Sequence, residues 1–169
     1  MKLATFSTAD NSSPRLGKVT EEGIVDLSAI DGLPRTMSAY LSGGRAAASA
    51  VASIDVHDAL PLAVVSLLAP VPNPGKVLGI GLNYADHVAE SGMEQPNVQV
   101  WFNKQHNCIN APYAGINLPA VSDKLDYEAE LCLVIGKRCK HVPRERAHEV
   151  IAGYFCGQLT TRPKCASGP

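Results

Sequence analysis

The alternation of apolar and polar residues divides the first part of the chain into short strands followed by helices. We expect strands at 2–7, 15–20 and 23–28, with turns at Ser13-Pro14 and Glu21-Glu22-Gly23 between them. Residues 36–41 and the alanine-rich stretch 45–52 have helical composition, and Gly43-Gly44 is expected to interrupt the helix. This order predicts a small α/β domain at the N-terminus.

A proline-rich segment separates this part from the rest of the chain. Pro70, Pro72 and Pro74 fall within five residues, and prolines at that density are incompatible with a helix or a central strand. We therefore place a small N-terminal domain at residues 1–70 and a second domain at residues 71–169.

The second domain has a pattern that is richer in strands. Strands are expected at 76–82, 98–104 and 127–135, and helices at 85–91 and 144–151. Gly92 is expected to stop the first of these helices, and Gly136-Lys137 closes the last strand.

Composition and charge narrow the class of protein. Of the 169 residues 46% are hydrophobic, which is enough for a core and argues against disorder of the whole chain. The 15 Lys and Arg nearly balance the 16 Asp and Glu, and no basic stripe with interleaved aromatics occurs, so nucleic acid is not an expected partner.

Neither a membrane span nor a disulfide framework is expected. The N-terminus lacks the apolar run of a signal peptide, and the longest apolar stretch, 60–71, is interrupted by prolines and too short for a bilayer. The five cysteines have no CxxC spacing, which argues against a structural zinc knuckle. The simplest expectation is a soluble cytoplasmic protein without a membrane partner.

Glu128-Ala129-Glu130 is the sharpest candidate for chemistry. On a strand, residues i and i+2 point to the same face, so both carboxylates would project together. Two such charges repel each other unless a cation lies between them, and oxygen ligands favour magnesium, manganese or calcium over zinc. The alternative is a surface strand with two solvated glutamates. Apolar neighbours such as Tyr127 and Leu131 favour a buried strand and hence a metal site.

His87 and Glu90 form the second candidate, because a spacing of three places them on one face of the predicted helix. A carboxylate that orients an imidazole makes it a better base toward water; the alternative is a surface ion pair. Lys104, at a predicted strand end, is either a ligand for an oxyanion or a carboxylate, or a solvated lysine. Gly79-Ile80-Gly81 lacks the third glycine of a dinucleotide fingerprint, so no nucleotide cofactor is expected.

Several short motifs follow one another between residues 76 and 156. They are Gly79-Ile80-Gly81-Leu82-Asn83-Tyr84, then His87 and Glu90, Phe102-x-Lys104, Leu125-Asp126-Tyr127-Glu128-Ala129-Glu130-Leu131, Val134-Ile135-Gly136-Lys137 and Ala152-Gly153-Tyr154. In this order they resemble the fumarylacetoacetate hydrolase family. Residues 1–70 are similar to the small leading domain common in its bacterial members.

The resemblance implies an α+β protein whose second domain is an incomplete, β-rich mixed sheet of the rolled type. It implies Mg²⁺ or Mn²⁺ held by Glu128 and Glu130, a water-activating pair of His87 and Glu90, and a catalytic Lys104. The substrate would be a 2,4-diketo acid or acylpyruvate whose C–C bond is hydrolysed, as in aromatic catabolism. Intact members are usually homodimers. The alternatives on the same fold are an isomerase or decarboxylase of hydroxy-dienedioates and a ureidoglycolate lyase.

The chain departs from the family pattern after Tyr154. The family's third metal carboxylate is an Asp, and ungapped alignment places Leu159 at its position; no Asp or Glu follows Glu149. We therefore predict a truncated member with an atypical tail at 155–169. Because hard-metal affinity scales with ligand charge and number, we also expect weakened metal binding. A non-catalytic remnant of the family is the remaining hypothesis.

Overall fold

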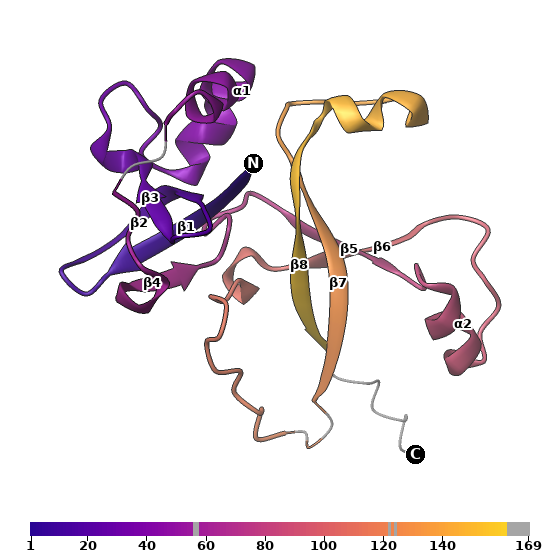
Figure 1. The fold of residues 1–169 in the computed structure, drawn as a ribbon. Helices are drawn as coiled ribbons and strands as arrows, with labels where there is room; N and C mark the ends of the chain where they lie inside the picture. Colours follow the sequence, from indigo (N-terminus) through magenta and orange to yellow (C-terminus); the bar gives the residue numbers. More distant parts are fainter. Residues whose placement is uncertain (56–57, 122, 124, 162–169) are drawn as a thin grey trace.

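The chain folds as an α+β protein with few helices and small antiparallel sheets (Figure 1). The computed structural model describes residues 1–55, 58–121, 123 and 125–161. Of the tail predicted as atypical, residues 162–169 lie outside this range. Among the described helices, none has the length and apolar character needed to cross a membrane.

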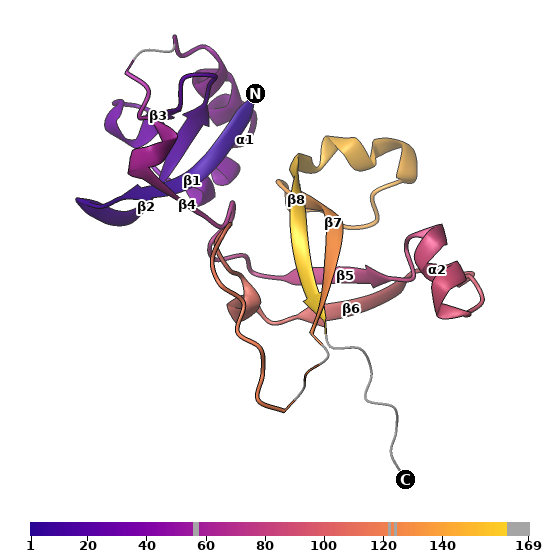
Figure 2. The same ribbon diagram turned by 60° about the horizontal axis from the view of Figure 1, so that its bottom comes forward.

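A four-stranded antiparallel sheet occupies the N-terminal part (Figure 1). Its strands are β1 (Lys2–Thr8), β2 (Asn11–Val19), β3 (Ile24–Asp26) and β4 (Val65–Leu68), in the order β3-β2-β1-β4. Short 3-10 helices occur at Leu27–Ala29 and Leu62–Val64. Figure 2 shows α1 (Met37–Ala52) lying against this sheet.

The turn predicted at Ser13-Pro14 is wrong, because both residues lie inside β2. The chain turns at residues 9–10 instead. Pro14 is accommodated because the β1–β2 register shifts between Phe6 and Thr8, so that the ladder is irregular at the point where proline offers no N–H. The strand predicted at 23–28 also ends early, at Asp26, whose carboxylate accepts a hydrogen bond from the Ser28 N–H (2.9 Å) and starts a 3-10 turn.

The predicted interruption of the helix is confirmed. Gly44 has φ 54° and ψ −134° within α1, a backbone conformation that residues with a side chain rarely adopt. Thr36 caps the start of the helix by accepting a hydrogen bond from the Ala39 N–H (3.2 Å).

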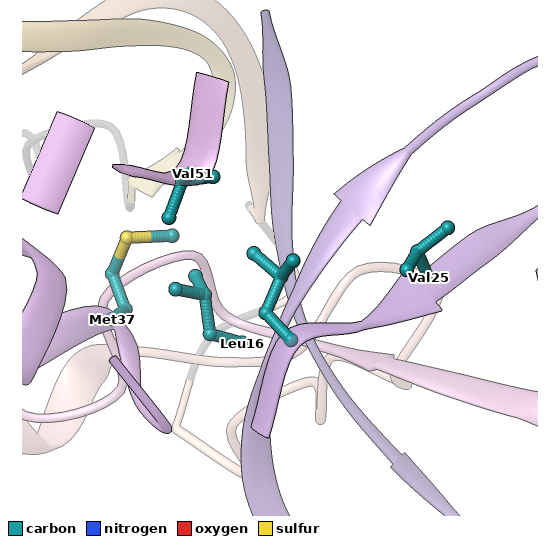
Figure 3. Close-up of a cluster of buried hydrophobic side chains, with 5 residues drawn as sticks. Leu16, Val25, Met37 and Val51 are labelled. Carbon is teal, nitrogen blue, oxygen red and sulfur yellow. The ribbon is translucent and has the colours of Figure 1, made fainter. Parts of the chain in front are cut away.

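The core of the molecule lies between this sheet and α1 (Figure 3). Its buried side chains come from two strands, the 3-10 turn and both ends of the helix: Leu16, Val25, Leu27, Met37 and Val51. Gly17 permits the close packing of β2, because a Cβ there would lie 2.2 Å from Ile24 Cγ2.

The second part consists of two antiparallel strand pairs (Figures 1 and 2). The first pair is β5 (Val77–Gly81) with β6 (Val100–Lys104), and α2 (Ala85–Ser91) lies between them in sequence. The second is β7 (Asp126–Ile135) with β8 (Ile151–Thr161). These elements confirm the predicted strands and the 85–91 helix, which ends at Gly92 (φ 64°).

The helix predicted at 144–151 is present, but it is a 3-10 helix and ends two residues earlier than predicted. A 3-10 helix spans Arg144–Glu149, and Ile151 already begins β8. The hairpin ladder determines this outcome, since Gly136 N–H donates to the Val150 carbonyl (2.8 Å) and Ile151 pairs with Ile135.

Candidate metal and acid–base site

Glu128 and Glu130 lie on one face of β7, as the i, i+2 spacing predicts. Both residues are half-buried, whereas the intervening Ala129 is exposed on the other face. The expectation that the apolar neighbours of Glu128 and Glu130 are buried is wrong: Tyr127 is 80% exposed and Leu131 67%. The reason is that, within the described residues, β7 pairs only with β8 and no other layer covers its second face.

Strand β8 supplies the residues opposite the two carboxylates. Glu128 pairs with Leu159 and Glu130 pairs with Gly157. Directly opposed residues of an antiparallel pair have their Cβ atoms about 4.5–5.5 Å apart, so position 159 is the nearest cross-strand neighbour of Glu128. Across the described part of the chain, no group of three or more His, Cys, Asp or Glu side chains could hold a metal ion.

Cys132 continues the same face of β7, two residues beyond Glu130. Burial raises the pKa of the Cys132 thiol, and the Glu130 carboxylate and Cys156 raise it further. The thiol is therefore held in its neutral form, which is a poor metal ligand. This face is both partly desolvated and negatively charged, and oxygen atoms are its ligands for a cation.

The predicted pair on α2 is in place but is not joined. His87 and Glu90 are both exposed, while Val88 between them is 9% exposed and anchors the helix. The described structure contains no hydrogen bond or ion pair between His87 and Glu90. Catalytic hydrogen bonds of this kind are often long without substrate. The water-activating role of His87 and Glu90 therefore stays a prediction.

Lys104 ends β6 and is half-buried. Its Nζ donates a hydrogen bond to the backbone carbonyl of Thr160 (3.2 Å), the residue after Leu159 on β8. Lys104 also lines an open cavity of about 400 Å³ together with Lys76 and His106. The structure thus brings the predicted lysine to the strand that faces Glu128.

Tyr84 makes a contact near the site that was not predicted from the sequence. Its hydroxyl accepts a hydrogen bond from the backbone N–H of Leu131 (3.2 Å), the residue after Glu130. Tyr84 stands in the quoted Asn83-Tyr84 motif, but a bond to a backbone atom 47 residues away leaves no trace in local spacing. The Tyr84–Leu131 bond links α2 to β7, and the Lys104–Thr160 bond links β6 to β8.

Comparison with known proteins identifies the family. Residues 76–164 match the model of the fumarylacetoacetate (FAA) hydrolase C-terminal domain. The chain is 38% identical over 159 residues to oxaloacetate tautomerase fahd2, mitochondrial, of Xenopus laevis, covering 91% of this chain and 50% of the relative. It is equally similar to the Bos taurus FAHD2A protein, with 38% identity over 159 residues, 91% of this chain and 51% of the relative.

Solved structures agree. The maleylpyruvate hydrolase of Sphingobium sp. SYK-6, in complex with manganese(II) and pyruvate, superposes with a TM-score of 0.78 and 30% identity, over 96% of this chain and 59% of that one. A 5-carboxymethyl-2-hydroxymuconate delta-isomerase from Mycobacterium smegmatis gives a TM-score of 0.67 and 30% identity, over 96% and 55%. The chain spans about half the length of the curated relatives it matches. It belongs to the fumarylacetoacetate hydrolase family.

Proposed function

We propose that this chain carries a divalent-metal site that acts on a 2-oxo acid, by hydrolysis of a C–C bond in a 2,4-diketo acid or acylpyruvate. The observation that supports it best is the placement of Glu128 and Glu130 on one half-buried face of β7. The relatives named above are hydrolases, isomerases and tautomerases, and one of them was solved with manganese and pyruvate, a 2-oxo acid.

The residues present suit a hard cation such as Mg²⁺ or Mn²⁺. Glu128 and Glu130 offer oxygen atoms alone, and magnesium is often bound through one or two carboxylates while water and substrate oxygens complete its shell. A bound metal would supply Lewis-acid stabilisation of the enolate that leaves when the C–C bond breaks. With Leu159 opposite Glu128, the affinity is expected to be weak.

The other site residues would transfer the proton and bind the substrate. In the proposal, Glu90 accepts a hydrogen bond from one ring nitrogen of His87, and the other ring nitrogen takes a proton from water. Lys104, whose Nζ already lies beside Thr160, binds the carboxylate of the substrate. These roles require α2 and β6 to stay in place against β7 and β8.

A second candidate reaction is the tautomerisation of oxaloacetate. It is supported by the 38% identity over 159 residues to an oxaloacetate tautomerase. Tautomerisation needs an enolate and a proton transfer but no bond cleavage. The isomerases among the structural neighbours are named for a hydroxymuconate and a hydroxy-dienedioate.

Manganese binding, followed by turnover, tests the proposal. Titration of the purified full chain should show saturable Mn²⁺ binding that Glu128→Gln weakens at least about tenfold, equivalent to about 1.4 kcal/mol. Glu145→Gln, on the exposed 3-10 helix, is the matched control and should leave binding unchanged. Acetylpyruvate and oxaloacetate, each assayed with saturating Mn²⁺, then separate hydrolysis from tautomerisation. Absence of saturable Mn²⁺ binding by the unmodified chain would contradict the proposal.

A further inference from the structure

We infer that Tyr84 is a positioning residue, whose hydroxyl holds α2 against the backbone of β7 beside Glu130. The inference rests on the proposed function, in which α2 carries the proton-transfer pair and β7 carries the metal carboxylates. Tyr84 itself is assigned no contact with metal or substrate.

Tyr84 is joined firmly to the helix that follows it. It occupies the N-cap position of α2, and its backbone carbonyl accepts a hydrogen bond from the Val88 N–H (3.1 Å). Val88 is the buried residue of this short helix. A displacement of the Tyr84 backbone therefore displaces the first turn of α2, where His87 lies.

The other end of the link is equally well placed. Leu131 follows Glu130 directly and pairs across the ladder with Cys156. Its N–H points to the Tyr84 hydroxyl (3.2 Å) and therefore away from β8, along the outer edge of β7. The bond satisfies an edge donor and at the same time fixes the strand beside the carboxylate pair.

The Tyr84 hydroxyl and the Lys104 ammonium act on different strands of the hairpin. Lys104 reaches the carbonyl of Thr160 on β8, whereas Tyr84 reaches the N–H of Leu131 on β7. Lys104 already has a proposed role toward the substrate, so its replacement would mix two effects. Tyr84 offers the cleaner test, because removal of one oxygen atom removes the link and leaves the ring.

Loss of this oxygen has a distinctive expected effect. Glu128 and Glu130 stay on one strand, held by the ladder with β8, so metal affinity should remain. The helix that carries His87 and Glu90 loses its tether to that strand, so proton transfer should slow. A kcat decrease with unchanged metal affinity separates positioning from general loosening of the hairpin, which would weaken both.

Tyr84→Phe and the matched control Tyr154→Phe test the inference. Tyr154 is also on the second part of the chain, is 60% exposed and pairs with Leu133, away from both carboxylates. Amide hydrogen exchange measured by NMR should show Leu131 exchanging at least about tenfold faster in Tyr84→Phe, and at the unmodified rate in Tyr154→Phe. With Mn²⁺ saturating, kcat should fall about tenfold in Tyr84→Phe alone, while the Kd for Mn²⁺ stays within about twofold.

Two results would overturn the inference. One is unchanged protection of the Leu131 amide in Tyr84→Phe; the other is a parallel loss of kcat and Mn²⁺ affinity. If the unmodified chain binds no Mn²⁺ and turns over neither substrate, the proposed function fails, and the exchange rates of Leu131 and of the α2 amides still decide whether Tyr84 tethers the helix.

Discussion

The two parts of the molecule differ in what they bury. Among the described residues, the buried hydrophobic side chains lie in residues 1–69, apart from Val88 in α2. The exposed large hydrophobic side chains lie mostly in the second part. Among the described residues, only Met1, Leu62 and Val64 belong to the first part, and the rest lie from Leu78 to Tyr154. The first part therefore has a closed core, and the second presents its candidate site on strand pairs held by their ladders.

This difference shows which forces fix the site. The β7–β8 pair exposes an apolar face that includes Leu131, Leu133 and Tyr154, so burial contributes little to its position. Its ladder and the hydrogen bonds from Tyr84 and Lys104 do so instead. Hydrogen bonds are directional and contribute about 0.5–1.5 kcal/mol net each, so loss of the Tyr84 oxygen should loosen α2 while the ladder keeps Glu128 and Glu130 in place.

Replacement of a core side chain should destabilise the protein far more than replacement of an exposed side chain in the second part. Leu16→Ala removes a side chain that is 0% exposed and should lower the free energy of unfolding by about 2–5 kcal/mol. Leu131→Ala, at 67% exposure, should cost no more than about 0.5 kcal/mol. Urea unfolding of both variants measures these costs, followed by far-UV circular dichroism for the first part, to which α1 contributes strongly, and by tryptophan fluorescence for the second part.

The single tryptophan allows the unfolding of the second part to be followed separately. Trp101 lies on β6 in the second part and is 55% exposed, so its fluorescence reports on that part alone. We expect Leu16→Ala to shift the circular dichroism transition more than the fluorescence transition. Equal costs for Leu16→Ala and Leu131→Ala would show that the two parts do not differ as their burial indicates.

The next effect is a gain of metal affinity at the strand pair. Leu159→Asp places a carboxylate directly opposite Glu128 and should tighten Mn²⁺ binding by about tenfold, equivalent to about 1.4 kcal/mol. Gln158→Asp is the matched control, because a shift of one residue along β8 points the new carboxylate to the opposite, exposed face. Calorimetric titration of both variants checks the effect. Equal tightening by both would mean that added charge alone, and not its place beside Glu128, controls the affinity.

The same contrast explains what could be predicted from the sequence. Local signals sufficed for α2, where Gly92 adopts a left-handed conformation, and for the face shared by Glu128 and Glu130. They failed at Pro14, where a register shift of the ladder accommodates the proline. They also placed the end of the 144–151 helix too late, because hairpin closure ends the 3-10 helix at Glu149. The domain boundary at residue 70 and the roles of the site residues remain predictions.

Long-range contacts account for the remaining misses. The apolar residues beside Glu128 indicated a buried strand, but Tyr127 and Leu131 are exposed. The pattern of apolar residues does not reveal how many layers cover a sheet. The link from Tyr84 to Leu131 joins residues far apart in the chain and follows no period. Prediction was thus most accurate where neighbours in sequence determine the outcome.

The smallest effect concerns an exposed ion pair on the connection between β7 and β8. Arg146 and Glu149 approach to 2.9 Å, and the hydrogen bond from Arg146 lowers the pKa of the Glu149 carboxyl. A lowered pKa in the folded state means that the contribution to stability is present above the ordinary glutamate pKa and is lost as pH falls through the lower, folded value.

Glu149→Gln should therefore reduce the melting temperature slightly at neutral pH and not at all at strongly acidic pH. Thermal melts at the two pH values, repeated in high salt, measure a difference that screening should also remove. A difference that persists in acid would assign the effect of Glu149 to packing of the connection, and the hairpin would then depend on more than its ladder.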